Sequence, residues 1–116
     1  MGRKEIEELT KIAASAIALT FVPFFEGFGI PLAEAMHCHT PIITSDVSCL
    51  PEIAGNTAIY ANPNDVNSIT NAIGEMYSND NKRNELIANC KIQKKAFSWD
   101  RAAAEVWEIL EQNLPC

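Results

Sequence analysis

The most informative residue types in the sequence lie between positions 26 and 34, where two glutamates flank a turn that contains two glycines. Glycine lets a backbone approach a ligand closely, and Pro31 is tolerated at the first position of a helix. A strand that ends before such a turn and a helix that begins after it leave free backbone N–H groups pointing at the turn. With the helix dipole, these donors predict an anion site that holds a phosphate without a cationic side chain.

The two glutamates have different expected roles at this site. Glu34 falls near the end of the first helical turn, where a carboxylate can accept hydrogen bonds from both hydroxyls of a ribose. Glu26 precedes the turn and would face the part of a ligand beyond its phosphates. Residue types alone leave a purely structural strand-to-helix turn open, since Leu32 replaces the third glycine of the dinucleotide fingerprint and the lysine of a P-loop is missing.

The hydrophobic pattern predicts the elements that position this turn. Apolar residues at helical spacing, together with capping residues, predict helices at 3–15, 31–37, 65–77, 80–96 and from 99 onwards. Short apolar runs predict strands at 17–22, 41–44 and 57–60. Because strands alternate with helices, we expect an α/β, Rossmann-like fold with a partial parallel sheet and flanking helices.

Capping residues and aromatic residues add expectations about the second half of the chain. Asn64 and Ser98 are the expected N-caps of the two helices that follow them. Trp99 and Trp107 fall on one face of the last helix, so we expect both in the core. Lys91, Lys94 and Lys95 are interpreted as a solvated helix face.

The charges are distributed unevenly along an acidic chain. The 116 residues carry a formal net charge of −6 with a pI near 4.8. All 9 basic residues lie outside positions 12–81, so the central segment has no Lys or Arg. This balance argues against nucleic acid or an anionic membrane as the main partner. A phosphate site in the middle of the chain must therefore depend on backbone donors.

The chain length, the cysteines and the apolar segments bound the class of protein. A length of 116 residues fits one domain. We find no signal peptide, and the longest apolar stretch, residues 13–25, is too short and too broken to span a bilayer. The 4 cysteines form no CxxC pair, which favours reduced thiols and a cytoplasmic location, with peripheral membrane association of a full-length enzyme left open.

The segment around the two glutamates resembles the E-x7-E signature of family 4 of the glycosyltransferases, the group 1 glycosyl transferases of GT-B fold. Glu26 and Glu34 match its two acids, and the neighbouring residues 28–31 and 34–36 match its best-defined part. Later segments also fit: Thr40–Ser45, Leu50–Gly55, Asn62–Asp65 and Phe97–Trp99. The resemblance covers nearly the whole chain.

The resemblance implies a fold, a reaction and roles for individual residues. Residues 1–116 would be the later half of a C-terminal, donor-binding domain, and the reaction would transfer a sugar from a nucleoside diphosphate to an acceptor hydroxyl with retention. Glu34 would bind the ribose and Glu26 would be the catalytic residue at the transferred sugar. The backbone that meets the sugar and diphosphate would be that of Phe28, Gly29, Ile30, Pro31 and Leu32. No metal or other cofactor is implied.

Several departures from the family pattern accompany this resemblance. The family's basic diphosphate ligands lie upstream, and its N-terminal acceptor domain has no counterpart in this sequence. We therefore expect the isolated chain to be inactive alone, to require the missing part of the enzyme as a partner, and to present residues 17–22 as an unpaired sheet edge. The donor nucleotide, the sugar and the glycan, lipid or protein acceptor are not specified. Around Cys38, where the family has a small residue and then a glycine that serves as a left-handed C-cap, this chain has His37 and His39, and histidine is a costlier occupant of that conformation.

Three other functions are alternatives for residues 26–39. A non-catalytic nucleotide-binding or structural remnant of such an enzyme is the main alternative. A glycoside hydrolase would use Glu26 and Glu34 as its acid and base, but it has no use for an anion site between them. A metal site at residues 37–39 would need three adjacent residues to ligate one ion, and no second ligand pair is evident. Asp46 and Ser48 follow a predicted strand and are candidates for the border of the site.

Overall fold

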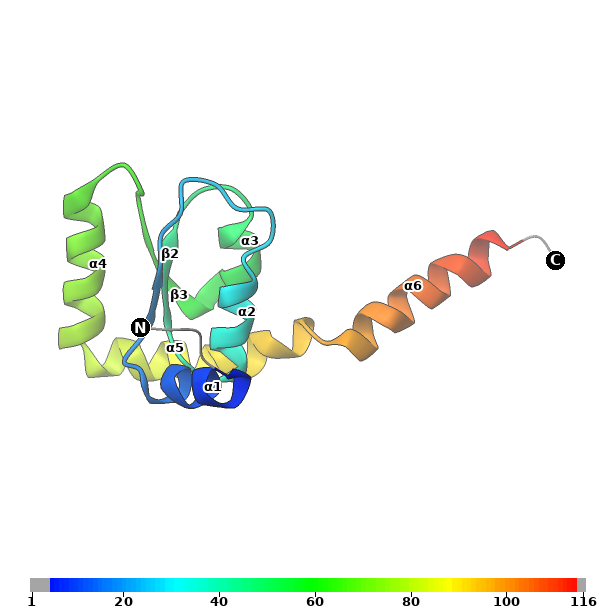
Figure 1. Ribbon diagram of the computed structural model, residues 1–116. Helices are drawn as coiled ribbons and strands as arrows, with labels where there is room; N and C mark the ends of the chain where they lie inside the picture. The colour runs from blue at the N-terminus through cyan, green and yellow to red at the C-terminus, as the bar shows by residue number, and fades with distance from the viewer. Residues whose placement is uncertain (1–4, 115–116) are drawn as a thin grey trace.

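The computed structural model describes residues 5–114, whose core is a parallel sheet of three strands in the order β1-β2-β3. The strands are β1 (Leu19–Phe21), β2 (Ile42–Ser45) and β3 (Ala58–Ala61). Leu19 pairs with Ile42, which in turn pairs with Ala58. Helices flank the sheet (Figure 1), so the predicted α/β fold with a partial parallel sheet is confirmed.

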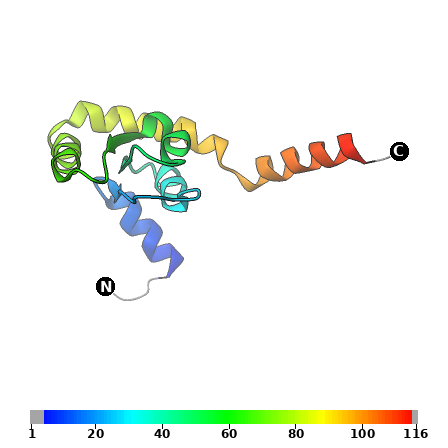
Figure 2. The ribbon, with the colours of Figure 1, turned by 90° about the horizontal axis from the view of Figure 1, so that it is seen from above.

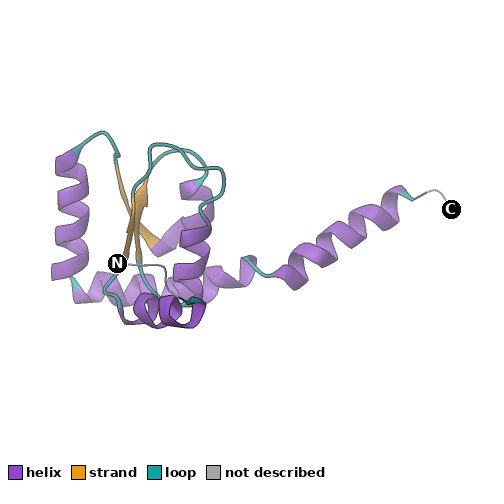
Figure 3. Ribbon diagram, in the orientation of Figure 1, coloured by secondary structure: helices purple, strands orange, loops and turns teal. Residues whose placement is uncertain are grey.

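The helices connect and cover these strands (Figure 3). They are α1 (Ile6–Ser15), α2 (Ile30–His37), α3 (Leu50–Ala54), α4 (Val66–Ser78), α5 (Asp80–Gln93) and α6 (Trp99–Asn113). Two 3₁₀ turns, η1 (Gly55–Thr57) and η2 (Lys94–Ala96), follow α3 and α5. In Figure 1, α1 and α5 lie near the end of the sheet where the strands begin. No helix within residues 5–114 is both long enough and apolar enough to cross a bilayer.

The central strand β2 is buried on both faces, as expected for a parallel sheet between two layers of helices. Ile42 belongs to the apolar cluster that contains Leu32 and Leu50 of α2 and α3. Ile43 faces the other way, into a cluster that contains Met76 of α4. This burial on both sides fixes the position of α2, and with it the loop that precedes α2.

One polar atom in this core is unsatisfied. Thr44 is fully buried, and its Oγ1 has no hydrogen-bond partner among the described residues. We predict that Thr44→Val raises the free energy of unfolding by about 1 kcal/mol, because a methyl group of similar size removes the desolvation penalty of the hydroxyl. Urea denaturation followed by circular dichroism measures this. An unchanged or lower midpoint would mean that the hydroxyl has a partner in solution.

The first strand lies at an edge of the sheet, as the sequence predicts. β1 pairs with β2 only, and no strand within residues 5–114 lies on its other side. It is shorter than the predicted range, since Ile17 precedes it and is 55% exposed. An edge strand with unpaired backbone groups is able to accept a further strand.

The capping predictions are half right. Ser98 caps α6, because its Oγ accepts a hydrogen bond from the backbone amide three residues on. Asn64 is not the cap of α4, and that prediction is wrong. Asp65 takes the position, and its carboxylate accepts from the amide of Asn67 at 2.9 Å. The amide of Asn64 donates to the side chain of Asn62, so Asn64 belongs to the preceding turn.

The last helix projects from the body of the molecule (Figure 2). No residue of α6 is buried, and Trp99 and Trp107 are 92% and 61% exposed. The prediction that both tryptophans lie in the core is therefore wrong for this chain. The radius of gyration, 16.4 Å, reflects the projection, since a compact chain of this length has about 13 Å. The apolar stripe of α6 has the right helical period, but its partner surface is not within residues 5–114.

The exposure of α6 leads to a test by mutation. We predict that Trp107→Ala changes the free energy of unfolding of the body by less than about 0.5 kcal/mol, whereas a buried tryptophan would cost about 3–5 kcal/mol. Thermal unfolding of the unchanged chain and of the variant measures the change in the free energy of unfolding of the body. A loss of more than about 2 kcal/mol would show that α6 folds back onto the sheet in solution.

Candidate functional site

The glycine turn lies beyond the carboxyl end of β1, where it leads into α2. Gly29 is the residue that precedes α2, and its φ of 85° lies in the left-handed region that glycine adopts without strain. A Cβ placed on Gly29 would lie 2.9 Å from Cδ2 of Leu50 in α3. Gly29 therefore lets the turn and α3 approach each other closely.

The backbone donors of this turn form a smaller set than the sequence predicts. Within the described part of the chain, the amides of Phe28, Gly29 and Ile30 donate no hydrogen bond. Pro31 has no N–H, and the amide of Leu32 donates to the carbonyl of Gly29 at 2.9 Å. Three consecutive amides, two ahead of α2 and one at its first residue, thus remain available to an anion at the positive end of the α2 dipole.

Glu26 is held in place through its backbone. Its carbonyl oxygen accepts from Ser48 Oγ at 2.7 Å and from Cys49 Sγ at 3.2 Å. Its carboxylate accepts from the amide of Gly27 at 3.1 Å, so the side chain turns toward the turn itself. Ser48 thus contacts the residue that precedes the turn, whereas Asp46 is exposed and makes no side-chain contact of this kind within residues 5–114.

The side chains that anchor this loop are not evident from the sequence pattern. Ser45, at the end of β2, donates to the carbonyl of Pro23, and Cys49 contacts Glu26 as described. Leu50 packs under Gly29. The sequence offers one indication of their role, which is their position: all three lie in or just after the second strand. Contacts between segments some 22 residues apart do not follow from local spacing.

Glu34 lies beside a separate groove. It is an exposed residue of α2 and lines a groove of about 240 Å³ between α1, α2 and β1. The other walls of the groove are apolar apart from Thr40, and they include Leu9 and Ile12 of α1 and Leu19 of β1. Pro31 also lines it, so the groove reaches the first turn of α2. Glu26 does not line the groove, so the two glutamates do not share one cleft.

The remaining predicted site residues divide into exposed and buried side chains. Ile30 and Phe28 are 63% and 45% exposed, and the Phe28 ring contacts Phe97 edge to face with centroids 6.0 Å apart. The side chain of Leu32 is fully buried in the core cluster. Leu32 can therefore contribute to a site only by supporting α2, since its side chain is covered and its amide is already bonded.

The expected departure at the end of α2 is present. Of the two histidines around Cys38, it is His39 that has the left-handed conformation, with a φ of 58°. The ring of His37 contacts the carbonyl of Ala33 at 2.9 Å. Within residues 5–114, no group of three His, Cys, Asp or Glu side chains is arranged to hold a metal ion.

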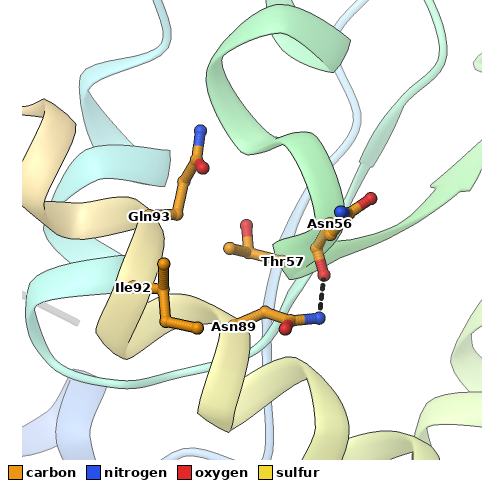
Figure 4. A pocket seen from close by; sticks show the side chains of 5 residues that line it. All are labelled: Asn56, Thr57, Asn89, Ile92 and Gln93. Atoms are coloured by element: carbon orange, nitrogen blue, oxygen red, sulfur yellow. Dashed lines mark hydrogen bonds between the residues drawn. The ribbon is translucent and has the colours of Figure 1, made fainter.

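A second, smaller pocket lies near the other end of the sheet (Figure 4). It has a volume of about 150 Å³, and its walls come from η1 and α5. Asn89 Nδ2 donates to the carbonyl of Asn56 across it at 2.8 Å. Its lining residues are Asn56, Thr57, Asn89, Ile92 and Gln93, none of which is titratable near neutral pH. The pocket therefore offers no acid–base chemistry.

The fold and the turn together define the class of protein. A parallel sheet between helices, with a glycine turn that opens onto the start of a helix, is a Rossmann-like arrangement. Residues 1–93 match the family model of the glycosyl transferases group 1. The chain belongs to this family, and the resemblance found in its sequence is confirmed.

Relatives and a solved structure agree with this assignment. The chain is 36% identical over 105 residues to O-antigen chain mannosyltransferase B of Escherichia coli, covering 90% of this chain and 28% of that protein. It is 32% identical over 112 residues to MMP alpha-(1->4)-mannosyltransferase of Mycolicibacterium hassiacum, covering 93% and 27%. Its structure matches sucrose-phosphate synthase of Thermosynechococcus elongatus with a TM-score of 0.83 and 27% identity, covering 97% of this chain and 29% of that one. The chain spans less than a third of the length of each of these proteins.

Proposed function

We propose that this chain supplies part of the donor site of a glycosyltransferase that moves a sugar from a nucleoside diphosphate to an acceptor hydroxyl with retention at the anomeric carbon. The single observation that carries the proposal is the run of three unbonded amides, Phe28 to Ile30, at the start of α2. Family membership supports the reaction class. The similar proteins named as mannosyltransferases favour a hexose as the sugar.

In the proposed reaction, negative charge develops on the departing diphosphate. The amides of Phe28, Gly29 and Ile30 donate to its oxygens, and the dipole of α2 adds a favourable potential. These donors are fixed by the fold before the reaction starts, so their orientation costs no reorganisation. The proposal needs no metal or other cofactor, although the central segment holds no Lys or Arg to share the charge.

The glutamates have separate roles in this proposal. Glu34 accepts hydrogen bonds from the ribose hydroxyls, and the apolar groove beside it receives the nucleoside. Glu26 acts at the transferred sugar, with its backbone held by Ser48 and Cys49. Because the two carboxylates do not line one groove, the arrangement favours sugar transfer over hydrolysis by a carboxylate pair.

The acceptor and the rest of the donor site belong to other parts of the enzyme in this proposal. We expect no transfer by the 116-residue chain alone and only weak binding of a nucleotide. The alternative of a non-catalytic remnant predicts nucleotide binding in the same groove but no transfer in any combination. Adding the half of a donor domain that supplies the basic diphosphate ligands distinguishes the transferase from the remnant. Sugar transfer by the combination supports the transferase, and its absence supports the remnant.

Calorimetry with guanosine diphosphate and uridine diphosphate tests the nucleoside part of the site. We predict that Glu34→Ala weakens the affinity roughly tenfold or more, because a carboxylate that accepts two hydroxyls is lost. Glu75→Ala, an exposed glutamate on α4, is the matched control and should leave the affinity unchanged. If both variants bind as the unchanged chain does, the assignment of Glu34 to the ribose is wrong.

A further inference from the structure

A cluster of basic side chains lies at the carboxyl end of α2, opposite the glycine turn. Lys94 Nζ is 2.8 Å from His39 Nε2, and the basic residues that lower the pKa of His39 are Lys94, Lys91 and His37. His37 is the last residue of α2 and His39 lies in the loop after it, while Lys91 belongs to α5 and Lys94 to the following 3₁₀ turn. The helix α2 has 8 residues, so its two ends are about 12 Å apart. The cluster is therefore separate from the donor turn.

The cluster is unusual because its charges are of one sign in an acidic protein. The ion pairs within residues 5–114 involve Lys82, Arg83 and Arg101, and none involves Lys91 or Lys94. Partial burial, then Lys94, Lys91 and His37, hold the pKa of His39 below its usual value of 6.5. The carboxyl ends of α2 and α5 carry partial negative charge, which makes the cations tolerable without pairing them.

The backbone of His39 is strained at the same place. His39 keeps a left-handed φ of 58°, a conformation that costs a residue other than glycine about 1 kcal/mol or more. That conformation accompanies the contact between the His39 ring and Lys94. The ring of His37 uses Nδ1 to contact the carbonyl of Ala33, and its Nε2 has no hydrogen-bond partner among residues 5–114. Strain and like charge are thus concentrated at one place, where a bound anion would offset the charge.

We propose that Lys94, Lys91, His39 and His37 bind a phosphate group, as a free phosphate or as the headgroup of a lipid. The Nζ atoms of Lys94 and Lys91 donate to its oxygens. While His39 is neutral, its Nε2 accepts from Lys94. When the anion binds, His39 takes up a proton and its Nε2 donates to the anion instead. Binding is accordingly tighter at lower pH.

Nuclear magnetic resonance of the full chain, with the histidine rings labelled, tests the proposal. Inorganic phosphate is titrated at pH 7 with the ionic strength held constant by sodium chloride. We expect a saturable shift of the His39 and His37 ring resonances and a rise of the pKa of His39. Lys94→Gln should weaken the binding roughly tenfold or more. Lys82→Gln, which removes a cation paired with Glu85, is the matched control and should bind as the unchanged chain does.

A second arm separates the two sources of the phosphate. Vesicles of phosphatidylglycerol are compared with vesicles of phosphatidylcholine in a sedimentation assay with the same variants. Saturable binding of inorganic phosphate supports a free phosphate, and Lys94-dependent binding to phosphatidylglycerol alone supports a headgroup. Shifts that equal those with sodium chloride, together with no Lys94-dependent vesicle binding, overturn the proposal. Binding at the donor turn is distinguishable, because it would shift the amides of residues 28–30 and not the His39 ring.

Discussion

Replacing Gly29 with valine is expected to lower the free energy of unfolding by about 3 kcal/mol. The residue has a φ of 85°, and a Cβ there would lie 2.9 Å from Leu50 Cδ2. A β-branched side chain in the left-handed region costs roughly 1–2 kcal/mol, and crowding of the packed core adds about 1–3 kcal/mol. The same change should displace the three free amides and so reduce nucleotide affinity. Urea denaturation and calorimetry measure the two effects.

Gly27 provides the matched control for this substitution. It lies two residues earlier in the same turn, its φ is not positive, and a Cβ on it would meet no atom within 4 Å. Gly27→Val should therefore cost less than about 1 kcal/mol. Equal losses for the two variants would show that the close approach of Gly29 to Leu50 does not shape the turn.

Truncation of Leu32 to alanine is expected to cost about 3 kcal/mol. Its side chain is fully buried against the cluster that includes Ile42 and Leu50, and buried leucines lose about 2–5 kcal/mol on this change. Leu32 lies in the first turn of α2, so the cavity loosens the helix that positions the donor amides. Thermal and chemical unfolding measure the loss.

Ile30 is the control for Leu32, because it lies on the same helix and is 63% exposed. Ile30→Ala should cost less than about 1 kcal/mol while the backbone amide at position 30 is retained. A reversed order of the two effects would mean that α2 packs on the sheet through its other face. The buried face of α2 that positions the turn would then be a different one.

The pattern of the sequence predicted the sheet and the site turn well, because both depend on local signals. Apolar runs gave the three strands, and Gly29 followed by Pro31 gave the start of α2 within one residue. A left-handed histidine where α2 ends also followed from local pattern, although only the structure assigns it to His39 and not to His37. Each of these depends on residues within a few positions of one another.

Other features depend on contacts that local spacing does not contain. The apolar stripe of α6 predicts burial of Trp107, yet it does not show whether the partner surface belongs to the same chain. Asn64 and Asp65 are equally suited to cap a helix, and the preceding turn, where Asn62 bonds the amide of Asn64, decides between them. The anchoring of Glu26 by Ser48 joins segments that only the folded sheet brings together.

The three free amides are the central element of the proposed donor site, and backbone amide resonances report on them directly. Guanosine diphosphate is titrated into the full chain labelled with nitrogen-15. We expect the largest saturable shifts at Phe28, Gly29 and Ile30, with a further shift at Glu34. Shifts confined to residues outside positions 26–34, or no saturable shift in the turn, would contradict the assignment of this turn as the diphosphate site.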